Sequence, residues 1–364
     1  MARNPSPVVF TSTATAVGDA VRDANPAVGG PGDRARSMPA RERKLWSGSD
    51  PLTGSFQIMG HDRAVNTAVL LMALGGPDSL EAVEPYLLDL RGGRPTSAEL
   101  VEEIRERYAA TGGRSPVLDI TRELGRRLEA IRPVRVFVGL RHWRPRIADA
   151  WGEIVAAAPE RVVAICMAPQ HSAMTVGKYW EKLDDAIAEV GGGGIPLQRV
   201  WSWATHPGLV EAFAGALDEA RRGLPPETPV LFTAHSLPER IVAEGDPYPG
   251  EVAATVEAVT ARLGLPVTRF AYQSQGRSPE PWLGPEVETV LAELAGEGHR
   301  HVVLAPIGFL SDHVEISYDI DIEFKAVAEK LGMELRRPPM LNAGDPLAAT
   351  LAALVDEQLG VSAA

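Results

Sequence analysis

Residues 229–239 read PVLFTAHSLPE, an apolar run that stops at Ala234 and is followed at once by His235 and Ser236. A short apolar run between Pro and polar residues is typical of a buried β-strand. Similar runs recur along the chain, with helical signals between them, which indicates parallel sheets in an α/β fold. The expected strands are Val65–Leu74, Val134–Leu140, Arg161–Ala168, Leu197–Trp201, Pro229–Ala234, Val267–Tyr272 and His301–Pro306.

The gaps between these strands predict helices. Thr96-Ser97-Ala98-Glu99 matches a capping box that opens a helix to about Tyr108. The other expected helices are Leu118–Ile131, Ser172–Val190, Gly208–Arg221, Pro249–Leu263, Pro285–Ala295, Asp312–Leu331 and Pro346–Leu359.

The strands are too many for a single sheet, so we expect two doubly wound halves, each with its own sheet, that meet near Trp201–Pro207. The first would cover residues 65–206 and the second residues 207–344. A last helix, at 345–360, is expected to pack back on the first half. Residues 1–60 hold few large apolar residues and many Gly and Pro, so they are expected to be a disordered extension.

Composition excludes several classes of protein. The 364 residues include 36 Lys or Arg and 48 Asp or Glu, giving a net charge of −12, a poor match to a nucleic-acid binder. The single cysteine, Cys166, cannot form an internal disulfide or ligate an iron–sulfur cluster alone. The sequence contains neither a spanning apolar stretch nor a secretory signal, so a cytoplasmic location is expected, with at most peripheral membrane contact.

Ligands of open α/β sheets bind outside the carboxyl ends of the strands. His235 stands at such an end, and His142 and His171 follow two other expected strands. Neutral imidazole is a base near physiological pH and a common metal ligand, although a structural histidine is an equal alternative from the residues alone. The sequence has no GxGxxG or Walker loop, so a nucleotide site has little support.

A second candidate is a row of acids in residues 308–324, GFLSDHVEISYDIDIEF. Asp312, Glu315, Asp319 and Glu323 follow one another at spacings of three, four and four residues, which places them on one face of a helix. The first two could simply cap the helix. Like charges in such a row repel one another, so a cation that visits the row would relieve the cost. Both interpretations remain open at this point.

Seven segments together resemble the ferrochelatase family, in the same order along the chain. Three carry most of the resemblance: FTAHSLPERIVAEGDPYP at 232–249, YQSQGRSPEPWLGP at 272–285 and PIGFLSDHVEISYDIDIE at 306–323. The others are MALGGPDSLEAVEPYL at 72–87, RYAATGGRSPVLDIT at 107–121, VGLRHWRP at 138–145 and APQHSAMTVGKY at 168–179. The segment at 90–116 is closer to the bacterial coproporphyrin III ferrochelatases. The resemblance implies two Rossmann-like halves around a porphyrin cleft.

The resemblance also implies roles for residues that match the family's motifs. His235 and Glu315 become the catalytic and metal-binding pair, and Asp319 and Glu323 continue the acidic row as metal-binding residues. His235 would also contact the porphyrin, together with Leu74, Arg91, Arg107, Tyr108, Ser115 and Tyr179. The chain departs from the family at Leu74, where coproporphyrin-type enzymes usually have Tyr, and at Tyr272, where Trp is common.

The implied reaction inserts Fe²⁺ into a porphyrin and releases two protons during haem biosynthesis. Fe²⁺ would be a substrate, no cofactor would be required, and haem-pathway enzymes are possible downstream partners. Coproporphyrin III is the preferred substrate, because its four propionates offer more charge to Arg91 and Arg107 than the two of protoporphyrin IX. The alternatives are a protoporphyrin IX ferrochelatase, a chelatase for cobalt or nickel, and a non-catalytic tetrapyrrole- or haem-binding protein.

Overall fold

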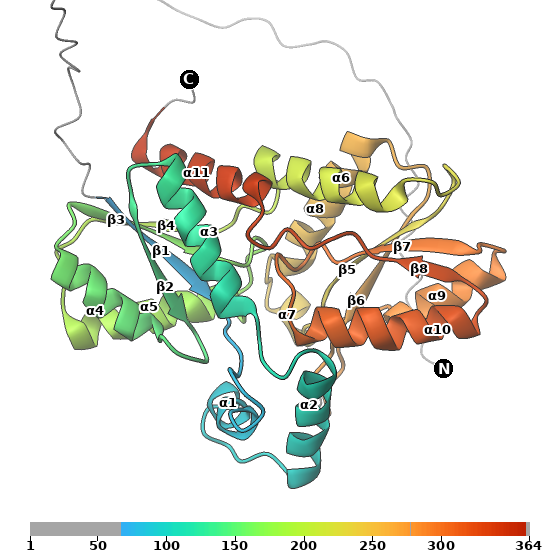
Figure 1. Ribbon diagram of the computed structural model, residues 1–364, viewed down its shortest axis with the longest axis horizontal. Coiled ribbons are helices and arrows are strands. Elements are labelled where there is room, and N and C mark those ends of the chain that lie inside the picture. Colours follow the sequence, from blue (N-terminus) through green and yellow to red (C-terminus); the bar gives the residue numbers. More distant parts are fainter. Residues whose placement is uncertain (1–66, 277, 362–364) are drawn as a thin grey trace, which may run out of the picture. The chain divides into compact units, whose positions relative to one another are not determined.

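The computed structural model describes residues 67–276 and 278–361, and contains two sheets of four parallel strands each (Figure 1). The expected extension at 1–60 lies outside these residues. The first sheet has the order β2-β1-β3-β4, formed by Arg135–Leu140, Thr67–Ala73, Arg161–Cys166 and Leu197–Val200. The second has the order β6-β5-β7-β8, formed by Thr268–Gln273, Val230–His235, His301–Ala305 and Glu334–Arg336. The expected α/β fold with two parallel sheets is confirmed.

The two sheets repeat one winding order. In each, the first strand along the chain lies between the second and the third, as β1 lies between β2 and β3. The strand order reverses at this point, and in doubly wound sheets ligands bind in the crevice that opens there, beyond the carboxyl ends of the strands. The fold therefore directs attention to Leu74, which follows β1, and to His235, the last residue of β5.

Helices cover both sheets (Figure 1). Those of the first half are α1 (Val83–Leu90), α2 (Ala98–Ala110), α3 (Val117–Ile131), α4 (Ile147–Ala157) and α5 (Val176–Val190). Those that follow are α6 (Pro207–Arg221), α7 (Arg240–Ala243), α8 (Tyr248–Leu263), α9 (Val287–Gly296), α10 (Lys325–Lys330) and α11 (Asp345–Leu359). Within the described chain no helix is both long and apolar enough to cross a membrane.

One buried apolar cluster joins the two halves. It includes Leu71 of β1, Phe232 of β5 and Leu351 of α11, and α11 packs against both α3 and α6. The last helix therefore contacts α3 of the first half and α6 of the second. The assignment of 65–206 and 207–344 as separate domains remains a prediction.

The prediction of one α-helix over Asp312–Leu331 is wrong in the type of helix and in where it begins. Residues Glu315–Phe324 are a π-helix, η1, which α10 continues, and Asp312 precedes it. Buried Ile316, Ile320 and Phe324 are spaced by four residues throughout. On an α-helix with 3.6 residues per turn, eight residues at this spacing drift by about 80°. The wider π turn, with i→i+5 hydrogen bonds, drifts in the opposite direction at this spacing, so the apolar repeat does not distinguish the two helices.

Other differences concern the ends and the shortest elements. Ser97, not Thr96, caps α2, because its Oγ accepts a hydrogen bond from the Leu100 N–H at 3.3 Å. The helices expected from Ser172 and Pro285 begin at Val176 and Val287. Helices α1, α4 and α7 and the three-residue strand β8 were not expected from the sequence.

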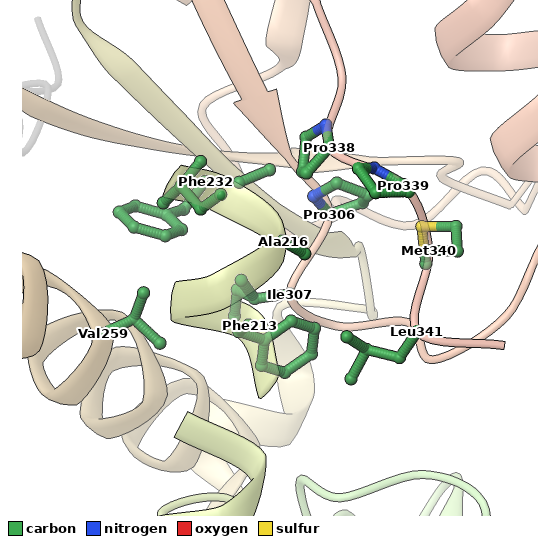
Figure 2. A pocket seen from close by; sticks show the side chains of 12 residues that line it. Phe213, Ala216, Phe232, Val259, Pro306, Ile307, Pro338, Pro339, Met340 and Leu341 are labelled. Atoms are coloured by element: carbon green, nitrogen blue, oxygen red, sulfur yellow. The ribbon is translucent and has the colours of Figure 1, made fainter. Parts of the chain in front are cut away.

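A small apolar cavity lies beside β5 and β7 (Figure 2). Its volume is about 10 Å³, and Phe213, Phe232, Pro306 and Met340 are among the residues that line it. A cavity of this size holds about one water molecule, and an apolar wall keeps it dry. It is therefore a packing defect of the core, far smaller than the roughly 300 Å³ of an organic ligand site.

Candidate active site

His235 ends β5 with its imidazole half-buried. Its Nδ1 lies 2.5 Å from the carbonyl oxygen of Ser236, and the hydroxyl of Tyr248 donates to the carbonyl oxygen of His235 at 2.9 Å. A carbonyl oxygen only accepts hydrogen bonds, so Nδ1 carries the proton in the neutral ring. The lone pair of Nε2 remains available, and this nitrogen lies 3.8 Å from Oε1 of Glu315. The ring is thus prepared to accept a proton at Nε2.

Glu315 is the first residue of η1, and it is held between two histidines. Its Oε2 lies 3.5 Å from Nε2 of His313, whose Nδ1 donates to the carbonyl oxygen of Ser311 at 3.0 Å. Burial alone would raise the pKa of Glu315, but His235, His313 and the Arg107 guanidinium outweigh it and lower this pKa to about 2. Glu315 is therefore a carboxylate throughout the physiological pH range.

His313 is a site residue that sequence reasoning missed. Burial disfavours its charged form, yet the hydrogen bond and charge of Glu315 keep its pKa above the usual value. The ring of Phe309 lies 5.0 Å from that of His313 and 6.5 Å from that of His235, measured between centroids. Its spacing of two residues from Glu315 gave no signal, because residues two apart do not face each other on a helix.

A cationic side chain from the first half of the chain, Arg107, contacts the acidic row of η1. Nη1 of Arg107, on α2, lies 3.0 Å from Oδ1 of Asp319, and Nη2 lies 3.6 Å from Oε1 of Glu323. The guanidinium also stands 4.8 Å from the centre of the Tyr318 ring. Asp312 is not part of this row, because its carboxylate contacts Asn342 and Arg337 instead. Arg107, expected to bind a propionate, therefore already offsets repulsion between two of the carboxylates.

Asp319 is the most deeply buried acid of the row. The hydroxyl of Ser274 donates to its Oδ2 at 2.7 Å. Burial raises the pKa of this carboxyl to about 6, with help from the nearby charges of Glu315 and Glu323, against the lowering effects of Ser274 and Arg107. Asp319 can therefore gain or lose a proton near neutral pH, whereas Glu315 cannot.

This raised pKa predicts a pH-dependent cost in stability. Because the folded pKa of about 6 exceeds the ordinary 3.8, the folded state binds this proton more tightly, and stability falls as pH rises between these values. Asp319→Asn should remove this cost. The difference in free energy of unfolding, variant minus wild type, should therefore be larger at pH 8 than at pH 5 by roughly 1–2 kcal/mol. Urea unfolding at both pH values measures this, and a difference independent of pH would contradict the raised pKa.

The other expected porphyrin contacts lie on several elements. Leu74 is 38% exposed, Arg91 is exposed at the end of α1, and Tyr108 and Tyr179 are buried on α2 and α5. Ser115 lies against Gly76, where an added Cβ would come within 2.5 Å of its Oγ, so only glycine allows this approach. Their roles toward a porphyrin remain predictions.

No three His, Cys, Asp or Glu side chains in residues 67–276 and 278–361 are grouped closely enough to hold a metal ion by themselves. The Glu315 carboxylate lies 3.5 Å from Nε2 of His313 and 3.8 Å from Nε2 of His235. The metal-binding role of His235, Glu315, Asp319 and Glu323 therefore remains a prediction.

The chain matches known proteins over most of its length. The family model Ferrochelatase matches residues 66–359. The chain is 41% identical over 289 residues to the ferrochelatase of Herpetosiphon aurantiacus, covering 77% of this chain and 94% of that protein. It is 35% identical over 290 residues to the coproporphyrin III ferrochelatase of Listeria innocua, covering 76% of this chain and 93% of that one.

A solved structure shares the fold. The sirohydrochlorin chelatase SirB of Bacillus subtilis in complex with cobalt superposes with a TM-score of 0.51 at 10% identity, covering 80% of this chain and 94% of that one. At such low identity the likeness concerns the fold alone. The match of the family model over almost all described residues, together with relatives above 40% identity, shows that the chain belongs to the ferrochelatase family, the lyases that insert iron into porphyrins.

Proposed function

We propose that this ferrochelatase inserts Fe²⁺ into coproporphyrin III, giving the iron porphyrin and two protons. The observation that carries the proposal is the opposition of His235 Nε2, with its free lone pair, to the ionised Glu315 at 3.8 Å. Metal insertion needs an acceptor for pyrrole protons at the ring centre and a negative group that attracts the divalent cation. These two side chains supply both from the carboxyl end of β5 and the start of η1.

The proposed mechanism assigns one task to each group. His235 takes one pyrrole proton at Nε2 and passes it to solvent, which reaches its 34% exposed side chain, before it takes the second; the carbonyl oxygen of Ser236 keeps Nδ1 protonated during each transfer. Glu315 stabilises the imidazolium that forms and attracts Fe²⁺. Oxygen and imidazole ligands bind Fe²⁺ without the strong affinity of thiolates, so the metal can leave for the porphyrin.

Beyond Glu315, the carboxylates of Asp319 and Glu323 continue along η1 toward Arg107. Glu323 has a side chain that is 44% exposed, whereas that of Asp319 is 8% exposed. A cation that reaches Glu323 would pass the buried Asp319 before it approaches Glu315, whose side chain is 32% exposed. We propose that the row delivers Fe²⁺, with Arg107 lowering repulsion between the acids while the metal is absent.

Two observations favour coproporphyrin III as the substrate: the positive charge available to its propionates, and the fact that some relatives are named coproporphyrin III ferrochelatases. Arg91 is exposed and has no ion pair within the described part of the chain, so it is available to a propionate. A substrate with four propionates gains more from such contacts than one with two. We further propose that the enzyme needs no bound cofactor and works in the cytoplasm; the single, buried Cys166 is consistent with a reducing compartment.

A competition assay tests the choice of porphyrin. Purified enzyme is given Fe²⁺ anaerobically with equal amounts of coproporphyrin III and protoporphyrin IX, and the two products are separated and quantified. We expect kcat/KM to favour coproporphyrin III by about tenfold or more, the effect of one additional charged hydrogen bond. A preference for protoporphyrin IX would assign the other substrate, and binding of both without insertion would indicate a tetrapyrrole carrier.

A further inference from the structure

A second pocket, outside the residues assigned to catalysis, lies between α1 and the loop that follows β2. Its volume is about 730 Å³, within the range of roughly 300–1,000 Å³ that small-molecule sites occupy. Pro85 and Leu88 of α1 line it together with residues 141–144 and 146 of the loop and with Lys182 of α5. The pocket is thus large enough for a substantial part of an organic ligand.

The charge of this pocket is opposite to that of the chain. Arg141, Arg144, Arg146 and Lys182 line it, against the single carboxylate of Asp89. Nδ1 of His142 lies 3.0 Å from Oδ2 of Asp89, and Nη2 of Arg146 lies 2.9 Å from Oδ1, so Asp89 is already engaged at both oxygens. Arg141, Arg144 and Lys182 have no ion-pair partner in residues 67–276 and 278–361. The pocket therefore has an excess of positive charge.

Arg141 is the most informative of these cations. Its guanidinium stands 5.5 Å from the centre of the Tyr179 ring, and its backbone N–H donates to the carbonyl oxygen of Ala73 at 2.9 Å. Burial lowers the pKa of Arg141, and the nearby Glu181 carboxylate is bound to Lys178 at 2.7 Å. A partly buried guanidinium without a bound carboxylate is costly, and an anion in the cavity would compensate it.

The pocket adjoins the edge of the sheet where the porphyrin is expected. The N–H of His142 donates to the carbonyl oxygen of Leu74 at 3.0 Å, and Trp143 stacks edge to face on Tyr86 with 6.2 Å between ring centres. The loop that carries the cations therefore begins beside Leu74, at the carboxyl ends of β1 and β2.

We propose that this pocket binds a carboxylate, with Arg141 as the principal contact and with Lys182 and Arg144 supplying further positive charge. A guanidinium matches a carboxylate with two parallel hydrogen bonds, which favours Arg141 over a lysine in this place. The carboxylate can come from a propionate of the porphyrin, an assignment that rests on the proposed function, or from a separate small polycarboxylate ion.

Binding measurements without metal distinguish these sources. The double variant Arg144→Gln/Lys182→Gln changes two exposed side chains and should fold, and Arg141→Gln removes the principal contact. Fluorescence quenching gives the Kd of metal-free coproporphyrin III, and calorimetry gives the Kd of citrate. Lys178→Gln is the matched control, because Lys178 lies one turn before Lys182 on α5 but outside the pocket.

If a propionate occupies the pocket, the variants should weaken coproporphyrin III binding at least about tenfold relative to Lys178→Gln. If a separate ion occupies it, porphyrin binding should stay unchanged while citrate binding is lost. Either result supports the carboxylate site, whereas unchanged Kd values for both ligands would overturn it. Iron insertion by the wild type is measured separately, so a failure of the proposed enzyme activity is not confused with a failure of this pocket.

Discussion

His235→Ala should lower the rate of iron insertion by about 10²–10⁴-fold, the usual loss on removal of a general base. No other described side chain offers a free imidazole lone pair toward Glu315, because Nε2 of His313 is already engaged with that carboxylate at 3.5 Å. The His235 side chain is 34% exposed and only its Nδ1 is bonded within the chain, so the fold should survive. Insertion is followed by the visible spectrum under anaerobic conditions.

The control for this variant is His299→Ala. His299 lies near Glu297 at 3.6 Å, in the turn after α9 and away from the crevice, so its loss should leave turnover unchanged. Melting temperatures of both variants should stay near that of the wild type. If His235→Ala retained more than half of the turnover, the proton would have another acceptor and the assignment would fail.

The fold was predictable because its strongest signals are local. Strands β1, β3 and β5 are almost entirely buried, so they appear in the sequence as continuous apolar runs between turns. Strand β8 has three residues, too few for a pattern, and α7 has four. The form of η1 was missed because the spacing of its acids and that of its buried apolar residues both fit one face of an α-helix, so no side-chain pattern distinguishes the two helices.

The candidate site was predictable only in part. His235 and Glu315 could be identified because one ends a strand and the other belongs to a recognisable motif. The bond between Arg107 and Asp319 joins residues 212 positions apart, and it depends on how α2 of the first half meets η1 of the second. No spacing in the sequence encodes such a contact. The cationic pocket was missed for the same reason, since α1, the loop after β2 and α5 come together only in the folded chain.

Glu315→Gln should reduce kcat by about 10²-fold or more, because it removes the negative charge that faces His235 and attracts the metal. Glutamine has nearly the same shape and can still contact His313, so the comparison isolates charge. Glu323→Gln is the graded control on the same helix, with a side chain that is 44% exposed. It should raise the KM for Fe²⁺ a few-fold and leave kcat nearly unchanged, because it is the outermost acid of the row.

An NMR titration of His313 separates this electrostatic role from simple damage to the fold. In the wild type, Glu315 raises the pKa of His313 against the opposing effect of burial. In Glu315→Gln burial is no longer opposed by a carboxylate 3.5 Å away, so the pKa of His313 should fall below its wild-type value. Glu323→Gln should leave this titration nearly unchanged. A loss of kcat without a fall in the pKa of His313 would mean that Glu315 does not act through its charge in the folded site, and the pairing with both histidines would have to be abandoned.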